Sequence, residues 1–259
     1  YSYQWNDDQT DATLVDRGGT DRDLRIKTGV GERVQTWRYP SRAECMVCHS
    51  RAANYVLGLC ELQMNKDHDY GGVVDNQLRV LEHLGVLRGN NAFEDMKNEL
   101  REDAKAKGWD EKKVDEFVAA QTATRLQREA KVGTMLGLSP EKHKRLVDPY
   151  DSKQDLNKRA RSFLHTNCAM CHVEAGGGNA QIDLEFTTAK DKMKLFDVKP
   201  VHHTFGLPDA KLIAPGHPER SVLLKRVAHR DAGFMPPVAT RVVDEAAARM
   251  LREWIEKMK

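Results

Sequence analysis

Hydrophobic and polar residues alternate in short runs over the first 40 residues. The runs cover residues 1–5, 12–15, 23–28 and 33–39, and Asp, Gly and Thr residues that favour turns separate them. Alternation with a period of two is typical of half-buried β-strands. We therefore expect residues 1–40 to form a β-rich N-terminal arm, or the remnant of an upstream β domain, because the segment is too polar to hold a core alone.

The pattern changes to a helical period after residue 40. Leu78, Val80, Leu81 and Leu84 share one helical face within residues 41–90. Residues 91–148 are highly charged and carry helix formers at 93–107 and 111–132, with Gly108 between them. This pattern predicts that the segment is a charged helical insert. The alternative is a partly disordered linker.

Residues 149–259 contain two further helix signals. Apolar spacing predicts a helix that leads into Cys168 and a last helix, capped by Asp244, with Leu251, Trp254 and Ile255 on one stripe. Ser221 is expected to cap a short helix between them.

Composition and charge exclude several classes of protein. Of the 259 residues, 40% are hydrophobic, and 41 Lys and Arg residues face 39 Asp and Glu residues. The near balance of charge argues against a nucleic-acid binder. No apolar run approaches the roughly 18 residues of a membrane span, so no transmembrane segment is expected. The chain shows no signal peptide, which indicates a cleaved leader or, as we favour, a piece of a longer protein.

The placement of the cysteines carries the chemistry. Four of the five cysteines form two CxxC pairs, and a histidine follows each pair directly: Cys45, Cys48 and His49, then Cys168, Cys171 and His172. CxxCH is the signature of covalent c-type haem attachment. The two sulfurs, one helical turn apart, bond the two vinyl groups of a haem, and the histidine ligates its iron. The sequence therefore predicts two covalent haems c, with His49 and His172 as iron ligands.

Other uses of CxxC pairs fit this chain less well. A structural zinc site needs four ligands close together, with pairs usually about 15–20 residues apart. A thioredoxin-like redox site belongs to a βαβ pattern, which is missing here. Plain structural disulfides would leave the histidine after each pair unexplained.

The sixth iron ligand separates electron transfer from ligand chemistry. For the second haem the candidate is Met235, because the prolines after it stiffen its loop, and Met193 is the reserve. For the first haem the candidate is Met64, with His68 as reserve. Cys60, His83 or an open position are the remaining alternatives.

Several segments resemble bacterial diheme c-type cytochromes. They are residues 213–226 and 234–237 in the second half and residues 3–12 and 76–78 in the first. The second half is similar to a class I cytochrome c. It has a helix that leads into CxxCH, a Met-Pro loop and a last helix, carrying Trp254, that would cross the first helix. Such modules are often the C-terminal cytochrome portion of larger exported proteins, some with a dehydrogenase domain.

The expected fold class is mainly α, with two cytochrome c-like haem modules. They would occupy residues 41–90 and 149–259, with the β segment 1–40 before them and the charged helical insert 91–148 between them. The expected function is electron transfer in the periplasm or another extracytoplasmic compartment, from a dehydrogenase to a downstream acceptor. The alternative is a diheme peroxidase-like enzyme, or a ligand-sensing haem protein, with one open or switchable haem.

Two weaker signals concern partners and the haem surroundings. Residues 174–179 are glycine-rich and predict a turn beside the haem edge. The stretch 141–161 is locally basic, which is typical of a solvated face and, alternatively, of a docking patch for an acidic redox partner. Its basic residues include Lys142, Lys144, Arg145, Lys158, Arg159 and Arg161.

Overall fold

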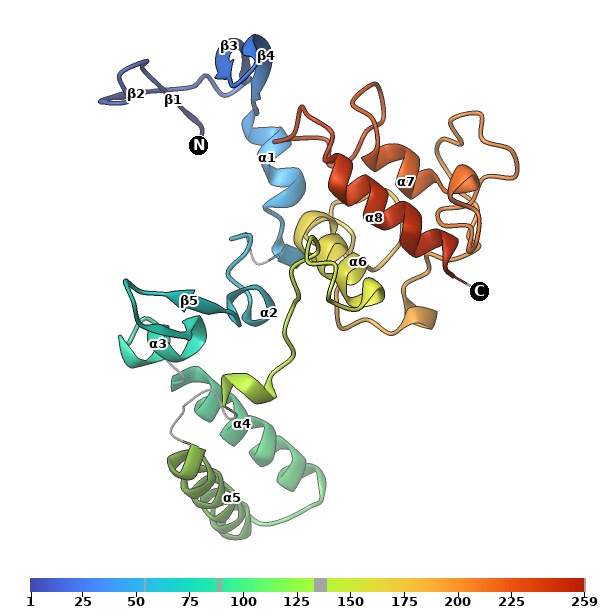
Figure 1. Ribbon diagram of the computed structural model, residues 1–259. Helices are drawn as coiled ribbons and strands as arrows, with labels where there is room; N and C mark the ends of the chain where they lie inside the picture. Colours follow the sequence, from blue (N-terminus) through green and yellow to red (C-terminus); the bar gives the residue numbers. More distant parts are fainter. Residues whose placement is uncertain (54, 88–89, 133–138, 259) are drawn as a thin grey trace. The chain divides into compact units, whose positions relative to one another are not determined.

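The computed structural model of the chain describes residues 1–53, 55–87, 90–132 and 139–258, and they form two compact units. Unit 1 joins Tyr1–Gly58 to Val147–Lys259, and unit 2 is the intervening segment Leu59–Leu146. Figure 1 colours the chain from blue at the N-terminus to red at the C-terminus. Residues 133–138 of the predicted charged insert lie outside the described residues.

Unit 1 begins with two β-hairpins (Figure 1). Strands β1 (Tyr3–Trp5) and β2 (Ala12–Leu14) pair antiparallel, and so do β3 (Thr20–Thr28) and β4 (Gly31–Tyr39). Each pair is a separate two-stranded sheet. The four strands predicted from alternation in residues 1–40 are confirmed.

Helix α1 (Arg42–Cys48) starts with a capping box. The Glu44 backbone N–H donates to Ser41 Oγ at 3.1 Å, and the Ser41 N–H donates to Glu44 Oε2 at 2.7 Å. Arg38 of β4 donates to the same carboxylate at 2.9 Å. This hydrogen bond is the main cause that lowers the pKa of Glu44 to about 2. The second hairpin and α1 are thereby tied together at the helix start.

The C-terminal part of unit 1 holds the main hydrophobic core. Its helices are α6 (Leu156–Leu164), α7 (Val222–Val227) and α8 (Glu245–Glu256). Trp254 Nε1 of α8 donates to Asn157 Oδ1 of α6 at 3.1 Å, so the last helix packs on the helix before the second motif. The largest side chains of this core include Phe163, Leu164, Leu184, Met193, Leu195, Ile213, Leu224, Leu251, Trp254 and Ile255.

The two predicted helix caps have different outcomes. Asp244 caps α8 as expected, because its Oδ1 accepts from the Ala247 N–H at 2.9 Å. Ser221 stands before α7 but makes no cap hydrogen bond. Its hydroxyl accepts from Ala214 N at 2.9 Å and donates to His217 O at 3.0 Å. Ser221 is therefore the N-cap residue of α7, as expected, but its hydroxyl closes the preceding loop and makes no hydrogen bond to the helix.

Loops and short 3-10 turns connect the elements of the chain. The described 3-10 turns are Arg51–Ala53, Pro140–Lys142, Lys190–Lys192 and Pro218–Arg220.

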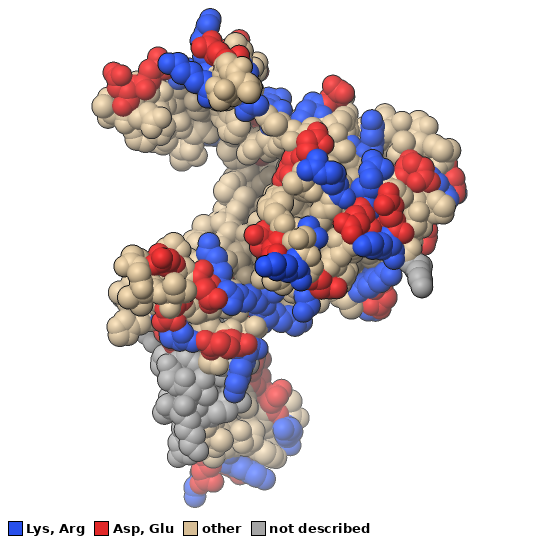
Figure 2. All heavy atoms as spheres, viewed as in Figure 1, with Lys and Arg blue, Asp and Glu red and all other residues tan. Residues whose placement is uncertain are grey.

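Acidic and basic side chains are interspersed over the face of residues 147–259 that Figure 2 shows.

Unit 2 starts with short elements arranged around a buried asparagine. Asn65 Nδ2 donates to Pro140 O at 2.9 Å and to Lys144 O at 3.1 Å, and its Oδ1 accepts from Asn76 Nδ2 at 2.8 Å. The two ends of the unit meet at this side chain. The elements nearby are α2 (Glu61–Met64), β5 (Asp67–Asp69), β6 (Val74–Asn76) and α3 (Gln77–His83).

The rest of unit 2 is a helical hairpin, as predicted. It consists of α4 (Asn90–Ala106) and α5 (Glu111–Val132). A small core joins the two helices through Ala104, Val114 and Val118, and Trp109 stacks edge-on against Phe117.

The predicted fold class is wrong. The structure has 37% helix and 15% strand in small antiparallel sheets, which does not match a mainly α chain of two cytochrome c-like modules. Residues 41–90 show the reason, because Asp67–Asp69 and Val74–Asn76 pair as a hairpin where a helical module was expected. Their helices α1, α2 and α3 have only seven, four and seven residues.

Candidate functional site

The first CxxCH motif forms the last turn of α1. Cys45 and Cys48 lie within the helix, and His49 is its C-cap residue, with its N–H donating to Cys45 O at 2.9 Å. Residues three apart on a helix share a face, so the two thiols project to the same side. The local backbone therefore has the arrangement that two thioether bonds to one porphyrin need.

The imidazole of His49 is oriented by a backbone carbonyl. Its Nδ1 lies 2.7 Å from Tyr55 O. A carbonyl oxygen only accepts, so Nδ1 carries the proton and Nε2 keeps its lone pair for a metal. Tyr55 has a φ of 61°, an unusual value for a residue with a side chain, and it carries the carbonyl that faces His49. Histidines that ligate a metal commonly donate their other ring N–H to a carbonyl or carboxylate in this way.

Large apolar side chains near the first motif are exposed. Met46, Val47, Tyr55 and Val56 each keep more than 40% of their surface in contact with solvent. Such side chains close to a ligand motif offer an apolar surface that a porphyrin can cover.

The second motif follows α6 through a turn of π-helix. The turn spans His165–Ala169 and includes Cys168. Cys171 N and His172 N then both donate to Cys168 O, at 3.1 and 2.9 Å. The motif is again one helical turn, and single π-turns inside helices are frequent at functional sites.

His172 is more buried than His49. Its Nδ1 is buried without a hydrogen-bond partner among the described residues. Burial is the main cause that lowers the pKa of His172, and the positive charge of Arg226 adds to the effect. The ring is therefore neutral near pH 7, which is the form that ligates metals.

The glycine run 176–178 packs directly on both motifs. A Cβ on Gly178 would lie 2.5 Å from His172 Nδ1, and one on Gly176 would lie 2.4 Å from Cys171 O. A Cβ on Gly177 would lie 2.3 Å from Val47 O of α1. Only glycine allows these approaches.

The structure brings the two motifs together. Cys171 Sγ lies 3.1 Å from Cys48 Sγ, although 123 residues separate them in sequence. The Cys171 thiol donates to Cys48, which lowers the pKa of Cys48 to about 7 and raises that of Cys171. Burial raises the pKa of Cys168 to about 12. The sequence predicts two separate modules for the motifs, and no local pattern in it indicates this contact.

The candidate sixth ligand of the second haem lies in a loop attached to α7. Met235 N donates to Arg226 O at 3.0 Å, and the Arg226 side chain is close enough for its charge to act on His172. Met193, the reserve, is fully buried in the main core.

The candidates for the first haem belong to unit 2, whereas the motif that they would complete belongs to unit 1. Met64 ends α2 and is half-buried, and His68 is exposed in β5 against Tyr70. Cys60 precedes α2, with its Sγ 3.4 Å from Gln63 Oε1, and His83 is exposed at the end of α3.

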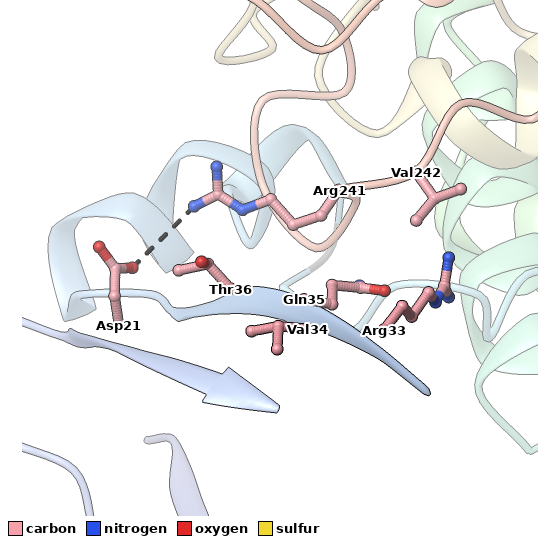
Figure 3. Close-up of a pocket in the computed structure, with 7 residues that line it drawn as sticks. All are labelled: Asp21, Arg33, Val34, Gln35, Thr36, Arg241 and Val242. Carbon is pink, nitrogen blue, oxygen red and sulfur yellow. Dashed lines mark ion pairs between the residues drawn. The ribbon is translucent and has the colours of Figure 1, made fainter. Parts of the chain in front are cut away.

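A shallow pocket of about 440 Å³ lies elsewhere in unit 1 (Figure 3). Strands β3 and β4 form one side, and the loop before α8 forms the other, with Arg241 4.0 Å from Asp21. Its lining contains no residue of either CxxCH motif: Asp21, Arg33, Val34, Gln35, Thr36, Arg241 and Val242.

Two alternatives from the sequence are a zinc site at the CxxC pairs and a docking patch in residues 141–161. Among the described residues, no three or more His, Cys, Asp or Glu side chains gather as a metal site. In the basic stretch 141–161, Arg161 is buried and its Nη2 donates to the carbonyls of Glu185, Phe186 and Thr188. Arg161 therefore belongs to the interior and not to a docking surface.

The residues of both motifs fit a covalently attached porphyrin. The thiols are paired on one helical turn, the Tyr55 carbonyl contacts His49 through Nδ1 and not Nε2, and His172 Nδ1 is buried without a partner among the described residues. No protein-family model, curated protein or solved structure matches the chain. No described helix combines the length and apolar character needed to cross a lipid bilayer.

Proposed function

We propose that the chain is a diheme c-type electron-transfer protein of an extracytoplasmic compartment. The observation that carries the proposal is the local structure of the two CxxCH motifs. Each forms one helical turn with its histidine directly after the second cysteine, and in the first the Tyr55 carbonyl prepares His49 for a metal. The resemblance to bacterial diheme c-type cytochromes supports the same function.

The residues would act in three ways. The four cysteines would hold two haems through thioether bonds, each made by addition of S–H across a vinyl group. His49 and His172 would provide iron ligands, and the Tyr55 carbonyl orients the His49 ring. Met235 is proposed as sixth ligand at the second motif, and Met64, with His68 as reserve, at the first. A bound haem supplies one-electron chemistry.

Partners follow from this chemistry. A carrier of single electrons needs a donor and an acceptor, which we propose to be a dehydrogenase and a downstream redox protein. Exposed apolar residues around the first motif, such as Met46 and Val56, would lie beside the haem held there.

Haem counting tests the proposal. The chain is produced with an export leader in a host that attaches haem c, and haem is measured by the pyridine haemochrome spectrum and by haem stain after denaturing electrophoresis. Two covalent haems per chain are expected. The variants C45S/C48S and C168S/C171S should each retain one, whereas Cys60→Ser should retain both as the control. A chain without covalent haem would refute the proposal.

The same preparation separates electron transfer from the enzyme and sensor alternatives. For an electron carrier we expect two low-spin haems that bind neither carbon monoxide nor peroxide. A high-spin haem that binds either ligand would favour the peroxidase-like or ligand-sensing alternative. Met235→Ala should convert one haem to a high-spin form if Met235 is its ligand.

A further inference from the structure

One thiol of each CxxCH motif faces a thiol of the other within unit 1. Cys171 Sγ lies 3.1 Å from Cys48 Sγ and 3.6 Å from Val47 O. A disulfide bond is about 2.05 Å long, so a movement of about 1 Å would join the sulfurs. The remaining cysteine of the second motif, Cys168, packs against the main core.

Backbone packing holds this contact. The end of α1 lies against the glycine run 176–178, where Gly177 approaches Val47 O so closely that a Cβ would lie 2.3 Å from that oxygen. Gly176 packs in the same way on the Cys171 carbonyl. The Gly178 N–H donates to Cys171 O at 2.8 Å. The two cysteines are therefore brought together by fixed backbone, not by flexible side chains alone.

We propose that, before haem is attached, Cys48 and Cys171 form a reversible disulfide that links the two motifs. The two thiols lose two protons and two electrons and gain one S–S bond. The electrons and protons go to an organic disulfide such as oxidised glutathione, which becomes two thiols. Disulfides form and persist in oxidising compartments outside the cytoplasm.

The disulfide has a consequence that rests on the proposed function. A sulfur in an S–S bond has no proton or lone thiolate to add to a vinyl group. One bond between Cys48 and Cys171 therefore blocks one attachment point in each motif. Haem loading at both motifs would depend on reduction of this single bond.

The disulfide is tested on the full haem-free chain, without reference to haem. The reduced protein is incubated with oxidised glutathione, remaining thiols are alkylated, and tryptic peptides are analysed by mass spectrometry. Trypsin leaves Cys45 and Cys48 together in peptide 43–51, and Cys168 and Cys171 together in peptide 162–190. A link between motifs joins these two peptides, whereas a link within a motif leaves them separate.

Paired variants identify the sulfurs. The cross-linked peptides should remain the main oxidised product in C45S/C168S, which keeps the facing thiols, and should fall by about tenfold or more in C48S/C171S. Persistence of the link in C48S/C171S, or a predominance of links within each motif, would overturn the proposal.

A denatured arm shows whether the fold directs the pairing. In concentrated urea the short loop within each motif closes far more readily than a loop of 123 residues, so links within motifs should dominate. The same product distribution in buffer and in urea would count against the proposal, because the fold would then not select the pair.

A final arm uses haem attachment as the readout. Chains oxidised beforehand should complete both thioether bonds at neither motif until a thiol reductant is added. C45S/C168S should show the same cross-link with no haem involved. If the chain cross-links but accepts no haem even after reduction, the result would support the disulfide and refute the proposed function. Haem attachment without cross-linking would do the reverse.

Discussion

At the scale of single residues, the glycines at 176–178 determine how closely the second motif is packed. None of the three has an unusual backbone conformation, so the need for glycine there is one of space. Gly178 is the most informative of them, because its neighbour is the ring of His172 and not only backbone.

Gly178→Ala should destabilise unit 1. The new methyl group would lie 2.5 Å from His172 Nδ1 and 2.9 Å from Cys171 O, so the loop or the ring must move. Overpacking of this kind costs about 1–3 kcal/mol. Urea unfolding followed by circular dichroism measures the loss. Gly29→Ala is the matched control, because nothing lies within 4 Å of its added methyl group. Equal unfolding midpoints for the two variants would contradict the packing described for Gly178.

At the scale of elements, helix α1 depends on a charged cap beside the first motif. The Glu44 carboxylate accepts hydrogen bonds from Ser41 N and Arg38, and its pKa is lowered to about 2. A carboxyl group whose folded pKa lies below its usual value of 4.5 stabilises the fold above that pH. The contribution is lost as the pH falls from about 4.5 towards 2.

Glu44→Gln should therefore lower stability near neutral pH and lose its effect in acid. The pair with Arg38 is partly exposed, so the cost at pH 7 should stay below about 1 kcal/mol. A cost of about 1 kcal/mol lowers the Tm of a chain of this size by about 2–4 °C, so we expect a smaller fall than that. Melting curves from pH 7 down to pH 3 measure the difference, which should narrow below pH 4.5. Glu256→Gln is the control, because this side chain at the end of α8 is exposed. A difference that grows in acid would contradict the assignment.

Elements were easier to predict from the sequence than the contacts between them. The hairpin strands of residues 1–40, the cap at Asp244 and the helices α4 and α5 follow from local pattern, because their backbone bonds join residues close in sequence. The N-cap position of Ser221 also follows from local pattern, but the partner of its hydroxyl does not, because Ala214 lies in an earlier loop. The contact of Cys48 with Cys171 depends on packing over 123 residues, which no local pattern reports.

At the scale of the whole molecule, the chain consists of two units, and different contacts join the distant segments of each one. In unit 1, the segments before and after unit 2 meet where the two motifs touch. In unit 2, the ends are joined by Asn65, a buried amide that uses both its donor and its acceptor groups. A defect in one unit should therefore leave the other folded.

Asn65→Ala tests that independence. The substitution removes the partners of Pro140 O, Lys144 O and Asn76 Nδ2, and each buried polar group left unpaired costs about 1–3 kcal/mol. Hydrogen exchange followed by mass spectrometry should show faster exchange in peptides from residues 59–146 and unchanged exchange in those from unit 1. Asn98→Ala on the exposed face of α4 is the control and should change neither. Faster exchange throughout the chain would show that the two units unfold as one, and the buried amide would then stabilise the whole molecule.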